Sequence, residues 1–203
     1  MASRTKEEDA EAIARVRTHW DARAPRYTDT ANKRVTIQCA RQLYAHMELH
    51  SAQRVLELCP DPDALLREAR RVLTDDGVAG FTIWAKPEHS ALFSIDAQVA
   101  LETGTGDGRD HANFALGKDL PALHQRFHDA GFSKVMLWPF LCVLELWSGE
   151  AFGDFYHDTF FFAVDNDELR DRRRAVATRL ATQWLEQKQF PLGLETYIIL
   201  ARP

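Results

Sequence analysis

The sequence predicts an α/β fold with a mostly parallel sheet of about four strands and helices flanking it. Strand-like runs rich in Val, Ile, Leu and Phe alternate along the chain with longer helical segments, which is the pattern of βαβ units. The 203 residues are 45% hydrophobic and 27% charged, as expected of one folded domain with a buried core. We therefore expect a single domain over 1–203, with a helical lead-in over 1–50 and a shortened α/β core over 54–203.

The lead-in is predicted to contain two helices. Over 7–23, apolar residues recur at helical spacing, and acidic residues crowd the first turn, where they suit the helix dipole. A second helix over 31–49 has one apolar stripe, made of Val35, Cys39, Leu43 and Met47. The run at 54–58 then forms the first strand of the core.

The next helix is predicted over 62–73. Asp61 is placed to cap it, and Pro62 falls at the first helical position, where its missing N–H is tolerated. The apolar face of this helix consists of Leu65, Leu66, Ala69, Val72 and Leu73. A turn signal ending in Gly77 leads to a strand over 78–85, so the helix can serve as a right-handed crossover between two parallel strands.

The rest of the chain continues this alternation. Helices are expected over 90–101, 118–130 and 166–188, and strands over 135–146 and 196–201. Pro139 interrupts one of these strands, which suits a sheet edge or a bulge. An aromatic-rich stretch comprises Phe152, Phe155, Tyr156, Phe160, Phe161 and Phe162. We expect it to pack in the core rather than to form a surface patch for a partner.

Charge and composition argue against several classes of function. The formal net charge of −5, from 30 acidic and 25 basic residues, disfavours a nucleic-acid-binding protein, which needs a basic surface. The basic cluster at 170–174 lies among acidic residues, which indicates a solvated helix face. No apolar stretch is long enough to span a bilayer, and the first residues lack the apolar core of a signal peptide. Three scattered cysteines favour no disulfide framework, so we expect a cytoplasmic protein without membrane partners.

Five segments resemble class I S-adenosylmethionine-dependent methyltransferases of the small-molecule, type 11-like group, in the order in which that family has them. Residues 20–27 are similar to its "W-D-x-x-A-x-x-Y" lead-in, and 55–58 to its first strand. Residues 66–77 resemble "L-R-E-x-x-R-V-L-x-x-G-G", with an aspartate where one glycine is usual, and lead in the family to the fifth strand. Residues 81–84 look like that strand, and 130–132 like the "A-G-F" before the terminal strand pair. The resemblance implies a reduced Rossmann-like methyltransferase fold, S-adenosylmethionine as the methyl donor and a small-molecule methyl acceptor.

The chain departs from the family where the cofactor should bind. In the family a glycine-rich turn follows the first strand, and a carboxylate that ends the second strand binds the ribose. Here the strand at 54–58 runs into Cys59 and Pro60, which supply no glycine. Compared with the family, about 60 to 90 residues are missing at this point, which is the length of the βαβ units that would contain its second to fourth strands. The resemblance keeps three cofactor-site residues, namely Tyr27, Glu57 and Cys59. We therefore expect S-adenosylmethionine binding to be impaired or absent, and no catalytic residue is assigned.

The loop around residue 105 offers a rival cofactor site. It fits an acid-x-Gly-x-Gly-x-Gly pattern through Gly104, Gly106 and Gly108, much like the missing turn. The residues before it have helical spacing, and those after it make a poor helix start. A surface loop is therefore favoured over a relocated cofactor loop.

Histidines are the remaining candidates for chemistry. The pairs His46 and His50, and His124 and His128, have a spacing that can bind a metal on a helix. Neither pair belongs to a zinc-protease pattern, so we expect exposed histidines and no metal.

His89 follows the predicted strand over 78–85, where a doubly wound fold places the residues that line its pocket. In that position it can contact a substrate or act as a base. Solvent exposure is nevertheless the favoured interpretation for His89, and capping of the following helix is favoured for Ser90.

Two functions remain open. In the first, the chain is an S-adenosylmethionine-dependent methyltransferase with impaired cofactor binding. In the second, it is a non-catalytic, methyltransferase-like remnant that acts as a protein-interaction module. The missing segment would leave the outer edge of the strand at 54–58 open to pairing, so the second function implies self-association through this edge.

Overall fold

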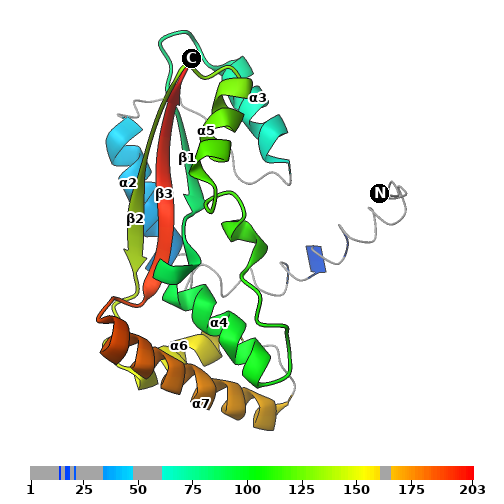
Figure 1. Ribbon diagram of the computed structural model, residues 1–203, viewed down its shortest axis with the longest axis vertical. Helices are drawn as coiled ribbons and strands as arrows, with labels where there is room; N and C mark the ends of the chain where they lie inside the picture. Colours follow the sequence, from blue (N-terminus) through cyan, green and yellow to red (C-terminus); the bar gives the residue numbers. More distant parts are fainter. Residues whose placement is uncertain (1–13, 15–16, 19–20, 22–33, 48–60, 161–165) are drawn as a thin grey trace.

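The computed structural model describes residues 14, 17–18, 21, 34–47, 61–160 and 166–203 of the chain (Figure 1). Its helices are α2 (Ile37–Met47), α3 (Pro62–Val72), α4 (Ala91–Glu102), α5 (Leu120–Asp129), α6 (Gly149–Phe160) and α7 (Asp167–Gln183). Its strands are β1 (Ala79–Trp84), β2 (Lys134–Val143) and β3 (Gly193–Arg202). Short helical turns are η2 (Pro87–His89), η3 (Ala112–Phe114) and the π-helical η4 (Trp184–Lys188). The helices and strands predicted within these residues are confirmed, with small shifts at their ends.

Several predictions fall outside the described residues. They concern the strand at 54–58 with its join to Pro60, most of the helix at 7–23, and the aromatic residues Phe161 and Phe162. Residues 14, 17–18 and 21 are helical, in agreement with the predicted helix. The organisation of the whole chain as one domain stays a prediction.

The prediction of a mostly parallel sheet of four strands is wrong. The described strands form a three-stranded sheet in the order β1-β3-β2, in which β3 runs antiparallel to both neighbours (Figure 1). Val143 at the end of β2 pairs with Gly193 at the start of β3, so the chain leaves and re-enters the sheet at the same end. Two successive helices, α6 and α7, connect β2 to β3 and bring the chain back to the end of the sheet that it left. A single helix would carry the chain to the other end of the sheet, from which the next strand would run parallel to β2. The alternation in the sequence does not reveal that difference.

Side chains alternate along β3 and divide the core between the two faces of the sheet. Ile198 belongs to the cluster that includes Cys39 of α2, whereas Ile199 packs with Leu123 of α5. Figure 1 shows α2 on one face of the sheet and α3 and α5 on the other. Helices α4, α6 and α7 gather beyond the end at which β2 finishes and β3 begins.

Helix α2 packs on the sheet through its predicted apolar stripe. Val35 and Cys39 are buried, and the helix contacts all three strands. A Cβ placed on Gly80 of β1 would lie 2.7 Å from Leu43 Cδ1 and closer still to the Met47 sulfur. Glycine at this position therefore permits the close approach of α2 to β1.

The start of α3 confirms the predicted cap. Asp61 Oδ1 accepts hydrogen bonds from the N–H groups of Asp63 and Ala64, each at 3.0 Å, and proline occupies the first turn. Leu66 is buried, but Val72 is 64% exposed. The apolar face of this helix is thus narrower than its sequence predicts.

Pro139 lies on an edge strand, as predicted. The side-chain amide of Gln38 bonds both backbone groups of Val143, donating to its C=O at 2.8 Å and accepting from its N–H at 3.2 Å. The backbone of Val143 therefore faces away from β3, and by the two-residue alternation of a strand so does that of Pro139. The N–H that proline lacks would have pointed outward, so no sheet hydrogen bond is lost.

Helices α6 and α7 bury both aromatic and charged side chains. Phe152, Phe155 and Tyr156 are buried, which confirms core packing for these three residues. The prediction of a solvated face at 170–174 is wrong for Arg173, which is only 8% exposed. Its guanidinium donates to Thr105 Oγ1 at 2.8 Å and to the Tyr156 hydroxyl at 3.3 Å, and these partners compensate for its burial.

Candidate functional site

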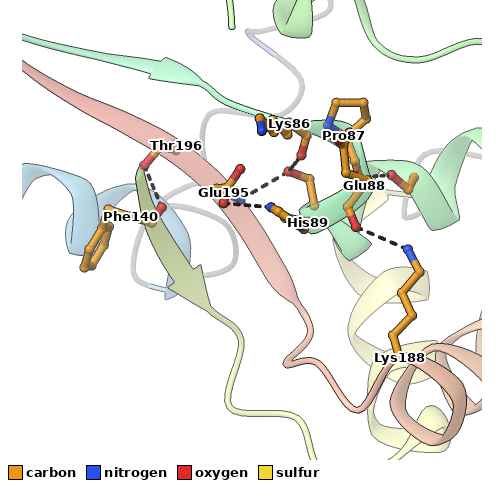
Figure 2. Close-up of polar contacts among 10 residues, drawn as sticks. Lys86, Pro87, Glu88, His89, Phe140, Lys188, Glu195 and Thr196 are labelled. Atoms are coloured by element: carbon orange, nitrogen blue, oxygen red, sulfur yellow. Dashed lines mark hydrogen bonds and ion pairs between the residues drawn. The ribbon is translucent and has the colours of Figure 1, made fainter. Parts of the chain in front are cut away.

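The carboxyl end of β1 carries the polar cluster shown in Figure 2. After this strand the chain makes one turn, η2, which Pro87 begins, and Ser90 then leads into α4. The turn brings His89 beside Glu195 of β3, a residue that is 106 positions away in the sequence. The cluster therefore joins the end of one strand, the start of a helix and the central strand of the sheet.

His89 and Glu195 form a histidine–carboxylate pair. His89 Nδ1 lies 2.9 Å from Glu195 Oε1, and the two side chains are 45% and 12% exposed (Figure 2). The other carboxylate oxygen, Oε2, is buried and has no hydrogen-bond partner among the described residues. A buried carboxylate is costly unless it is compensated, so its presence in an apolar strand marks a site with a specific role.

Ser90 ties the turn to β3. Its hydroxyl donates to the Lys86 carbonyl at 2.7 Å and accepts the Glu195 N–H at 3.2 Å. Ser90 is the N-cap residue of α4, as predicted, although its side chain makes no capping hydrogen bond to that helix. The serine instead holds the backbone of Glu195 and so fixes where its carboxylate lies.

A groove of about 310 Å³ runs beside this turn, between α4 and the end of α7. Two residues that line the groove make hydrogen bonds to η2. Ser94 Oγ donates to the Pro87 carbonyl, and Lys188 Nζ donates to the Glu88 carbonyl at 3.2 Å. Lys188 Nζ also lies 3.6 Å from the centre of the Trp184 ring. The volume is that of a small organic molecule, and the groove is joined to the turn through Ser94 and Lys188, while His89 itself does not line it.

The pair has the geometry of an oriented base. When His89 Nδ1–H donates to Glu195, the imidazole is held in one tautomer and Nε2 is left as a proton acceptor. The His89 side chain is half-exposed, so the ring is only partly covered by the surrounding residues. The Phe190 ring packs beside the imidazole, with its centre 5.5 Å from that of His89.

The sequence singled out His89 as a candidate but not its partner Glu195. His89 was expected to be solvent-exposed, and it is half-exposed but bonded to a carboxylate. Glu195 was missed, because nothing in the sequence links it to a residue 106 positions earlier. The signal that could have found it is a lone acidic residue in the otherwise largely apolar run of β3.

The three cofactor-site residues kept by the resemblance cannot be placed. Tyr27, Glu57 and Cys59 all lie outside the described residues. Their predicted role therefore stays a prediction.

The glycine loop after α4 does not fit S-adenosylmethionine. A helix rather than a strand precedes Gly104, and only the short turn η3 follows. A Cβ on Gly106 would lie 3.0 Å from Ala100 Cβ, and one on Gly108 would lie 3.0 Å from the Leu101 side chain. These glycines allow the loop to fold back on α4, and the strand–turn–helix arrangement that cradles a cofactor is not formed there.

Of the other histidine candidates, His50 lies outside the described residues, so its pairing with His46 stays untested. The remaining candidates do not assemble a metal site within the part of the chain that the structure describes. No group of three or more His, Cys, Asp or Glu side chains is placed there to hold a metal ion. His128 Nδ1 lies 3.0 Å from the Phe132 carbonyl, which gives this histidine a local role at the end of α5.

Comparison with known proteins adds no family. No family model matches the sequence, and no curated protein matches it. None of the described helices is long and apolar enough to cross a bilayer.

Proposed function

We propose that this chain is a methyltransferase-like domain of the class I small-molecule type, with His89 and Glu195 on the acceptor side of its site. We further propose that the isolated chain binds S-adenosylmethionine weakly or not at all. The single observation that carries the first part is the 2.9 Å contact between His89 Nδ1 and Glu195 Oε1 at the carboxyl end of β1.

The arrangement of the resembling segments supports this proposal. The segment at 66–77 covers most of α3 and the turn that leads to β1, and the segment at 81–84 lies in β1 itself. The segment at 130–132 immediately precedes β2, and β2 pairs with the last strand, β3. These are the relations that the resemblance implies for the fifth strand and for the terminal strand pair.

The chemistry of methyl transfer suits the histidine. A hydroxyl or amine acceptor becomes a better nucleophile when a base removes its proton, and His89 Nε2 can take that proton while Glu195 stabilises the resulting imidazolium. The neighbouring groove has room for a small acceptor. Glu195 is a positioning residue in this scheme, because it acts through the imidazole.

Calorimetric titration tests the cofactor part of the proposal. We expect S-adenosylmethionine and S-adenosylhomocysteine to give no saturable heat up to millimolar concentration, because the join at Cys59 and Pro60 replaces the glycine turn of the family. A cooperative thermal melt of the same sample serves as the control for folding. Saturable binding with micromolar affinity would show this part to be wrong.

Such binding would also open a test of the acceptor part. Methyl transfer from labelled S-adenosylmethionine to small hydroxyl and amine compounds would then be compared for wild type, His89→Gln and Glu195→Gln. The base role requires transfer to fall in both variants while cofactor affinity stays the same. Unchanged transfer in His89→Gln would contradict it.

A second function is favoured by the outer edge of β1. Among the described residues, this strand pairs with β3 alone, and no hydrogen bond joins another segment to its other edge. Ala85 N–H donates to the Glu195 carbonyl, so by strand alternation Thr82 turns its N–H outward. An edge of this kind can pair with a strand of a second copy, as a non-catalytic interaction module would require.

If the second function holds, sedimentation velocity will show dimers that increase with protein concentration. Thr82→Pro is expected to abolish them, because it removes an outward N–H without removing a bond to β3. Thr82→Val keeps the N–H and is the matched control, which should dimerise like wild type. A well-folded wild-type chain that stays monomeric at high concentration and exposes no apolar surface would count against this function.

A further inference from the structure

Two cysteines that are far apart in the sequence meet in the core. Cys39 of α2 and Cys142 of β2 are 103 residues apart, yet their Sγ atoms lie 2.8 Å from each other. Both are free thiols, and they are 8% and 0% exposed. A disulfide bond has a length of about 2.05 Å, so a small movement of the two side chains would bring the sulfurs to bonding distance.

The neighbouring residues hold these two thiols in register. Gln38 precedes Cys39 and Val143 follows Cys142, and the side chain of Gln38 makes two hydrogen bonds to the backbone of Val143. Thr196 of β3 adds a third contact, with its Oγ1 3.4 Å from Cys39 Sγ. The approach of the sulfurs is therefore supported by the polar contacts between α2 and the sheet.

The two thiols are chemically unequal. The hydrogen bond from Cys142 lowers the pKa of Cys39 below its ordinary value, in spite of the opposing effect of burial. The same contact, together with burial, raises the pKa of Cys142. Cys39 is therefore the more readily ionised of the two thiols, and a thiolate is the form of cysteine that attacks an oxidant.

We propose that Cys39 and Cys142 are a modification site, at which a small peroxide converts the two thiols into a disulfide that links α2 to β2. The Cys39 thiolate attacks one oxygen of hydrogen peroxide, the O–O bond breaks, and the leaving hydroxide is protonated to water. The Cys142 sulfur then attacks the sulfenic acid on Cys39, the S–S bond forms, the S–O bond breaks, and a second water leaves. Both sulfurs are oxidised in this sequence and one peroxide is reduced.

The disulfide would join the N-terminal part of the described fold to its sheet. Helix α2 contacts all three strands, and the link would close a loop of 103 residues. Closing so long a loop restricts the unfolded chain, and for a protein of this size the expected rise in Tm is about 10 °C. A reductant such as dithiothreitol should reverse the rise.

The test uses the full chain with Cys59→Ser, so that Cys39 and Cys142 are the remaining thiols. After hydrogen peroxide treatment, quenching and denaturation, we expect the loss of both thiols, a mass lower by a pair of hydrogen atoms, a monomer on a non-reducing gel and the higher Tm. In wild type the same intramolecular disulfide between Cys39 and Cys142 is expected. Adding Cys39→Ser or Cys142→Ser to Cys59→Ser leaves one thiol and should abolish both the mass change and the rise in Tm.

Either of two results would overturn this proposal. One is that the Cys59→Ser protein keeps both thiols under conditions that oxidise a free thiol peptide in the same tube. The other is that its thiols are lost with added oxygen mass or as disulfide-linked dimers, because both products show that Cys39 and Cys142 do not react with each other. A Tm that is unchanged despite an intramolecular disulfide would contradict only the expected stabilisation by the link between α2 and the sheet.

Discussion

Arg173→Met is expected to lower the free energy of unfolding by about 3 kcal/mol. The guanidinium of Arg173 is buried and donates to Thr105 and Tyr156, and the Tyr156 hydroxyl donates in turn to Asp96 Oδ1 at 2.6 Å. Burial and the negative charge of Asp96 raise the pKa of Tyr156, so this hydroxyl stays protonated as the donor. Methionine keeps much of the length of arginine but leaves the carboxylate of Asp96 without its nearby positive charge.

Denaturant unfolding of the variant and of a neighbour on the same helix measures this effect. Arg172 is exposed. Within the described residues, its guanidinium makes a single long hydrogen bond, of 3.5 Å, to the Glu102 carbonyl. Arg172→Met should therefore change the free energy of unfolding by no more than about 0.5 kcal/mol. Equal effects of the two substitutions would mean that the buried network between α4, α6 and α7 contributes nothing to stability.

Ile198→Ala is expected to lower the free energy of unfolding by about 3 to 4 kcal/mol. Ile198 has no exposed surface, and its strand is the central one, with Thr82 and Trp138 as register partners on either side. Removing most of the side chain loses buried apolar area and leaves a cavity between the sheet and α2. The sheet cannot close this cavity, because hydrogen bonds on both sides of β3 hold it at a fixed distance from β1 and β2.

A graded series separates this effect from general damage to the strand. Ile198→Val removes one methyl group and should destabilise by about 1 kcal/mol. Met136→Ala is the surface control on β2, because Met136 is 63% exposed and should change stability by less than about 0.5 kcal/mol. If alanine and valine at position 198 had the same effect, the dense packing of this site would be refuted.

Local features of the fold were predictable from the sequence. Asp61 with Pro62 marks the start of α3 through the chemistry of a few adjacent atoms, and the stripe from Val35 to Met47 marks the buried face of α2 through helical periodicity. Pro139 indicates an edge strand because it has no N–H to give to a neighbour. Each of these signals acts within one or two turns of the chain.

The candidate site was less predictable than the elements that carry it. Position after β1 singled out His89, because residues that follow strands gather at one edge of a sheet. Its partner Glu195 depends on β3 lying beside β1, and Arg173 is buried only because α7 packs on α6 and α4. Composition and periodicity describe a residue in its own segment and do not say which distant segment will cover it.

Most of the described helices and strands, the start of α3 and the buried stripe of α2 could be read from the sequence alone, as could the residues that follow β1 into the turn. The tertiary structure alone decided that β3 enters between β1 and β2 in the antiparallel direction, that Glu195 orients His89, and that Cys39 meets Cys142. The physical reason is the range of the forces involved. Caps and periodicity act between neighbours in the chain, whereas strand order and side-chain pairing are selected by burial of the whole core at once.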